Sequence, residues 1–144
     1  MRARDFLNQL EHDKIVKTIG HAEHATSAEI RVFISRKEPE DPVAAAQKAF
    51  VHLGMHNTRE KNGVLIFVAP RVRKFAVIGD AAVHAKCGDE FWKEVAEEIS
   101  THFRNGNFTG GILYGITRAG KLLAEHFPRH TGDKNQLPDD IASD

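Results

Sequence analysis

Residues 62–80 of the chain read NGVLIFVAPRVRKFAVIGD, and this stretch decides the fold. Residues 64–69 are too few and too rich in β-branched and aromatic side chains for a helix, and Pro70 ends the run, so they predict a central strand. Residues 71–73 connect this run to a second apolar segment at residues 74–78. So short a connection between two strands predicts an antiparallel hairpin.

A further strand and two helices are predicted before the hairpin. Residues 28–35 alternate, which places Ile30, Val32 and Ile34 on one face and Glu29, Arg31 and Phe33 on the other, and this pattern predicts a strand. Asp41 as the N-cap and Pro42 at the first helical position predict a helix that Gly54 ends. The first helix of the chain is predicted to begin near Asn8, a good N-cap residue.

Helical spacing of apolar side chains returns after the hairpin. It predicts a short helical turn over residues 81–86, a longer helix that begins near Asp89, and a last helix over about residues 108–126. Helices outnumber strands and have to cover both faces of the sheet, so we expect an α/β fold, a three-layer α/β/α sandwich around a small mixed β-sheet. We expect a single domain over residues 1–128, and a flexible tail over residues 129–144, which lose nearly all apolar content.

Composition restricts the class of protein. The 144 residues include 20 Lys+Arg and 20 Asp+Glu, and the isoelectric point is about 7.1. A neutral chain lacks the long-range positive field of a general nucleic-acid or membrane binder, so we expect neither as a partner. The chain shows no apolar run long enough for a signal or membrane anchor. We therefore expect a cytoplasmic protein that is a monomer.

Acidic side chains are predicted to meet at one edge of the sheet. A helix joins the first two strands, which makes them parallel, and the hairpin reverses the third, so Glu29 before the first strand and Asp80 after the third share an edge. We expect residues 57–62 at that edge too, with Asp89 and Glu90 brought within reach by the turn after Asp80. A hard cation such as Ca²⁺ or Mg²⁺ would relieve the repulsion between the carboxylates. The alternative is structural, since Asp89 is a good helix N-cap, Asp80 follows glycine in a turn, and Glu29 could pair with a cation on a neighbouring strand.

Other candidates for a functional site are weaker. The nine histidines show no zinc-binding spacing, and we interpret them as surface residues. Cys87, beside Lys86, has no signature of a nucleophile, so catalytic residues remain unassigned. The basic residues Arg71, Arg73 and Lys74 could contact a phosphate or an acidic partner, but we interpret them as charges that keep an edge of the sheet soluble.

Four segments resemble the TPM domain family, which includes thylakoid-lumen proteins involved in photosystem II repair. They are HATSAEIRVFI, HNTREKNGVLIFVAPRVRKFAVIGD, DEFW and HFRNGNFTGGILYGI, and the resemblance covers roughly residues 7–128. It implies an α/β/α sandwich around a mixed sheet, binding of Ca²⁺ or Mg²⁺, and the weak acid phosphatase activity claimed for some plant members. By position, Glu29 of TSAEI and Asp80 of VIGD match the acidic site, with Asp89 as a third ligand. Many relatives carry a secretion signal and a membrane anchor, and this chain looks like the soluble, anchor-free branch.

Three functions are compatible with these features. The first is a domain that binds a divalent cation at the acidic edge and has little or no catalysis of its own. The second is a weak, metal-assisted acid phosphatase, in which the ion would polarise a phosphoryl oxygen and Asp80 or Asp89 would orient water. This function would also need a nucleophile positioned in line with the phosphoryl group. The third is a protein-interaction or repair-assembly module.

Overall fold

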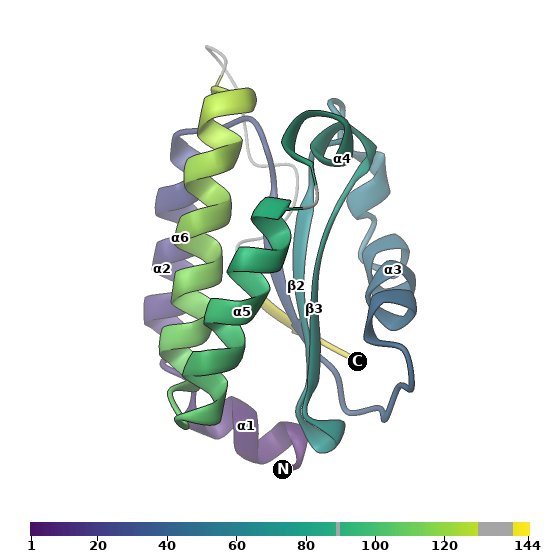
Figure 1. The fold of residues 1–144 in the computed structure, drawn as a ribbon, viewed down its shortest axis with the longest axis vertical. Helices are drawn as coiled ribbons and strands as arrows, with labels where there is room; N and C mark the ends of the chain where they lie inside the picture. Colours follow the sequence, from purple (N-terminus) through teal and green to yellow (C-terminus); the bar gives the residue numbers. More distant parts are fainter. Residues whose placement is uncertain (89, 130–139) are drawn as a thin grey trace.

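The computed structural model describes residues 1–88, 90–129 and 140–144. The elements in chain order are α1 (Ala3–Gln9), α2 (His12–His24), β1 (Ile30–Ile34), α3 (Pro42–His52), η1 (Met55–Asn57), β2 (Val64–Ala69), η2 (Pro70–Val72), β3 (Lys74–Gly79), α4 (Ala81–Cys87), α5 (Glu90–Arg104), α6 (Phe108–His126) and β4 (Ile141–Ser143). Helices α2, α5 and α6 lie on one side of the sheet and α3 lies on the other (Figure 1). This arrangement confirms the predicted three-layer α/β/α sandwich.

The sheet is mixed and has the strand order β3-β2-β1-β4. Strands β1 and β2 are parallel, as a helical connection between them requires, and Ile30 pairs with Val64. Strands β2 and β3 are antiparallel, and Val64 also pairs with Gly79. The predicted hairpin and the predicted parallel pair are both confirmed.

Side chains that point alternately to the two faces of the sheet divide the hydrophobic core into two layers. Ile30, Val32 and Ile34 of β1 belong to the core beneath α2 and α6, whereas Phe33 belongs to the core beneath α3. Successive side chains of a strand point to opposite faces, so one five-residue strand supplies both cores. All five residues of β1 are buried, as expected for a strand covered on both faces.

Helix α6 is the longest of the described helices, with 19 residues, and its small residues allow close packing. A Cβ atom at Gly120 would lie 2.7 Å from Cβ of Ala22 in α2, and one at Gly115 would lie 2.9 Å from Cδ1 of Ile99 in α5. Glycine at these positions therefore lets α6 approach both neighbouring helices. Within the described residues, no helix is both long enough and apolar enough to cross a membrane.

The start of the first helix was predicted wrongly. Asn8 lies inside α1, and a separate helix α2 begins at His12. The backbone N–H of Glu11, between the helices, donates to Oγ1 of Thr109 at 3.1 Å. Phe6 is only 2 % exposed and lies 4.8 Å, centroid to centroid, from Phe108. Contacts with a segment about a hundred positions away in the chain fix the break between α1 and α2. Local capping signals therefore cannot predict this break.

Residues 140–144 differ from the flexible tail expected from composition, and residues 130–139 lie outside the described part. Strand β4 pairs in parallel with β1. The Asp144 carboxylate accepts hydrogen bonds from Oγ of Ser35 at 2.5 Å and from the backbone N–H of Arg36 at 2.7 Å. A strand held by backbone and carboxylate hydrogen bonds needs few apolar side chains, so composition does not indicate it.

A histidine joins β4 to α2 and predicts a pH dependence. Nε2 of His12 lies 2.9 Å from Oδ1 of Asp140, and this hydrogen bond raises the pKa of His12 above its ordinary value of 6.5. A raised pKa means that the pair stabilises the fold fully below the unfolded-state pKa and loses that effect as pH rises through the folded-state pKa. We expect Asp140→Asn to lower the titration midpoint of the His12 ring in an NMR titration. An unchanged midpoint would show that the contact is absent in solution.

Candidate metal site at the edge of the sheet

Glu29 and Asp80 lie at the same edge of the sheet, on either side of Gly63. The backbone N–H of Val64 donates to the carbonyl of Glu29 at 2.8 Å, and the N–H of Asp80 donates to the carbonyl of Gly63 at 2.9 Å. These bonds place the residue before β1, the residue before β2 and the residue after β3 in one row. The strand directions predicted from the sequence therefore bring both acidic residues to one edge.

Asp80 combines a structural contact with an unused oxygen. Its Oδ1 accepts the backbone N–H of Ala81 at 2.7 Å, which makes Asp80 the N-cap of α4. Its Oδ2 is buried and accepts no hydrogen bond from the described part of the chain. The helix cap explains one oxygen of this carboxylate and leaves the other available to a ligand.

Two buried carboxylates flank the start of β1. Glu29 is 2 % exposed and Glu23 of α2 is 3 % exposed. Oε2 of Glu23 accepts the backbone N–H of Ile30 at 2.7 Å, so this side chain closes the end of the strand. Nothing in a helical pattern distinguishes Glu23 from an exposed glutamate, so its burial was not predictable from the sequence.

The loop before β2 adds neutral oxygen atoms. Asn62 is 1 % exposed, and its Nδ2 donates to Oγ of Ser27 and to Oε2 of Glu60, both at 3.2 Å. Its Oδ1 is buried and accepts no hydrogen bond within the described residues, and the same is true of Oγ1 of Thr58, which is 3 % exposed. The sequence placed residues 57–62 near this edge but gave no sign of which side chains would be buried.

The side chains at this edge that could hold a hard cation carry carboxylate, amide and hydroxyl oxygens. Asp89, the third predicted ligand, lies outside the described residues. In the part of the chain that the structure covers, no three His, Cys, Asp or Glu side chains group closely enough to hold a metal ion by themselves. Ca²⁺ also accepts amide, hydroxyl and water oxygens, and buried oxygens without partners are rare in native proteins. The buried oxygens of Thr58, Asn62 and Asp80 that have no hydrogen-bond partner within the described residues are possible ligand atoms of this kind.

Cys87 at the end of α4 is not an activated nucleophile. Burial raises the pKa of its thiol, and the nearby charge of Lys86 lowers the pKa by less. The thiolate is the nucleophilic form, so a raised pKa keeps this group unreactive near neutral pH.

The fold and this edge define an α/β/α domain with a row of buried oxygen atoms at one end of its sheet. The chain belongs to the TPM domain family, whose profile matches residues 1–122. The solution structure of the BA42 protein from the psychrophilic bacterium Bizionia argentinensis is similar, with 37 % identity and a TM-score of 0.86, over 93 % of this chain and 92 % of that one.

A second solved structure shares the fold at a lower sequence identity. The N-terminal domain of a protein from P. gingivalis is 17 % identical, with a TM-score of 0.60, over 79 % of this chain and 75 % of that chain. At that identity the likeness concerns the fold alone. No curated protein matches the chain.

Proposed function

We propose that this TPM domain binds a divalent cation, Ca²⁺ or Mg²⁺, at the edge of the sheet formed by Glu29, Asp80 and the loop before β2. Thr58 and Asn62 would supply neutral oxygens and the two acidic residues the negative charge. The ion would offset the repulsion between the carboxylates, and the domain would have little or no catalysis of its own.

The observation that carries this proposal is the set of buried oxygens without hydrogen-bond donors. Leaving a buried polar group unsatisfied costs about 1–3 kcal/mol. Thr58 and Asn62, which precede β2, and Asp80, which follows β3, each leave one such oxygen. Three such penalties, together about 3–9 kcal/mol, are large against the roughly 5–15 kcal/mol of net stability of a typical domain. A cation with oxygen ligands would offset them together.

Calorimetric titration of chelator-treated protein with CaCl₂ and with MgCl₂ tests the proposal. We expect saturable binding of at least one ion by the wild type, and a loss of affinity of about tenfold or more in Asp80→Asn and in Asn62→Leu. Asp80→Asn removes a negative charge from the edge, and Asn62→Leu removes an amide oxygen.

The matched control is Asp41→Asn. Asp41 is also a helix N-cap, at the start of α3, where its carboxylate accepts the N–H groups of Val43 and Ala44. Asparagine caps a helix about as well as aspartate, so neither Asp→Asn change removes a cap. Wild-type affinity in Asp41→Asn is expected. Absence of heat with both ions, or equal affinity in Asp80→Asn, would contradict the proposal.

The phosphatase alternative has less support. Metal-assisted phosphoryl transfer needs a nucleophile or an oriented water, and the raised pKa of Cys87 makes this thiol a poor candidate. Cation binding with little or no catalysis therefore remains the proposed function.

A further inference from the structure

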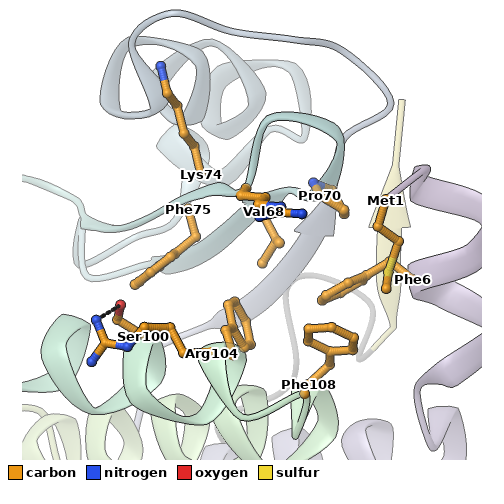
Figure 2. Close-up of a pocket in the computed structure, with 12 residues that line it drawn as sticks. Met1, Phe6, Val68, Pro70, Lys74, Phe75, Ser100, Arg104 and Phe108 are labelled. Carbon is orange, nitrogen blue, oxygen red and sulfur yellow. Dashed lines mark hydrogen bonds between the residues drawn. The ribbon is translucent and has the colours of Figure 1, made fainter.

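A cavity lies at the other end of the sheet from the acidic edge. It has a volume of about 510 Å³, which is in the range of small-molecule sites, roughly 300–1,000 Å³. Figure 2 shows Phe75 of β3 on one side of the cavity and Phe6 and Phe108 on the other. The ring centroids of Phe75 and Phe103 are 5.5 Å apart. Phe75, Phe103 and Phe108 remain only partly buried, so the cavity presents aromatic surface to solvent.

The charged side chains around the cavity are basic. Arg73, Lys74 and Arg104 line it, and none of the described residues that line it is acidic. Lys74 points away from the rings (Figure 2), and its Nζ donates to the carbonyl of Glu40 at 2.7 Å. Arg104 donates to the hydroxyl oxygens of Ser100 and Thr101, which carry no charge. Arg73 and Arg104 therefore have no carboxylate partner in the described residues.

The backbone at Arg73 favours a role for its side chain. Arg73 has φ 55° and ψ 40°, a left-handed conformation that glycine adopts at less cost. Arg71, on the same turn, instead forms an ion pair with Glu38 at 3.2 Å. Residues held in strained conformations cluster at functional sites, and here the strained residue is an arginine that lines the cavity.

We propose that this cavity binds an amphipathic organic anion, an apolar body carrying one carboxylate or one phosphate. The apolar body would lie among the phenylalanine rings, and the anionic group would meet the guanidinium groups of Arg73 and Arg104. This site is separate from the acidic edge and goes beyond the proposed cation binding.

The test is an NMR titration of ¹⁵N-labelled protein with decanoate, decyl phosphate and 1-decanol, followed at the amides of Ser100 and Gly106. These ligands share one alkyl chain and differ in the headgroup. We expect the amides to shift with the anions, and 1-decanol to bind about tenfold more weakly or worse, because a charge-assisted contact is lost. Preference for either anion identifies the headgroup and supports the proposal.

Three variants separate binding from folding. Arg73→Gly and Arg104→Gln should each weaken binding of the anion about tenfold. Arg73→Gly should also raise Tm by about 2–4 °C, because glycine relieves the left-handed strain. Arg71→Gln is the matched control and should bind as the wild type does. Equal affinity for 1-decanol, equal loss in Arg71→Gln, or no shift at the cavity amides would overturn the proposal.

Discussion

Calcium at a hundredfold excess over its Kd will raise the free energy of unfolding of the wild-type protein by about 2.7 kcal/mol, because an ion that binds only the folded chain stabilises it by mass action. For a domain of this size, that corresponds to a rise in Tm of about 5–10 °C. Asp80→Asn should lose most of this rise. Urea denaturation and thermal unfolding, each with CaCl₂ and with a chelator, measure the two quantities.

Two controls distinguish binding from general salt effects. KCl at the same ionic strength should leave the stability nearly unchanged, since it screens charges without occupying the edge. Asp41→Asn should keep the full response to calcium, because Asp41 caps a different helix. An equal response of Asp80→Asn and the wild type would count against the site.

Ile66→Ala will lower the free energy of unfolding by about 2–5 kcal/mol, the usual range for truncating a fully buried aliphatic side chain. Ile66 is 0 % exposed and lies between Val32 and Val77 in the centre of the sheet. A Cβ atom at Gly115 of α6 would lie 3.1 Å from its Cδ1, which shows how closely the helix covers it. Urea denaturation should give a lower midpoint with an unchanged slope.

Val51→Ala is the control for this truncation. Val51 is also a branched aliphatic residue, but its side chain lies on α3 and is 57 % exposed. The change should stay within about 0.5 kcal/mol of the wild type. Similar losses in both variants would mean that burial at Ile66 does not dominate the stability.

The first three strands of the sheet were predictable because their signals are local. Pro70 ends β2, a short connection leads to β3, and Asp41 with Pro42 begins α3, where the carboxylate caps the helix as expected. The break between α1 and α2 was not predictable, because Thr109, far away in the chain, receives the N–H of Glu11.

The candidate site was predictable only in part. Strand directions alone brought Glu29 and Asp80 to one edge. They could not identify Thr58 or Asn62, because burial of a loop side chain depends on what packs over the loop. The cavity at the opposite end was not predicted either, since it forms only where Phe6 of α1, Phe75 of β3 and Phe103 of α5 surround one space.

The sequence by itself determined the alternation of strands and helices, the hairpin and the edge at which Glu29 and Asp80 both lie, because hydrophobic periodicity and turn residues act over a few positions. Tertiary structure alone decided which oxygens of the described residues are buried without hydrogen-bond partners. It also decided that, within the described residues, the two arginines lining the cavity lack a carboxylate partner, and that residues 141–143 add a strand to the sheet. Burial and pairing join segments that are distant in the chain, so no local pattern records them.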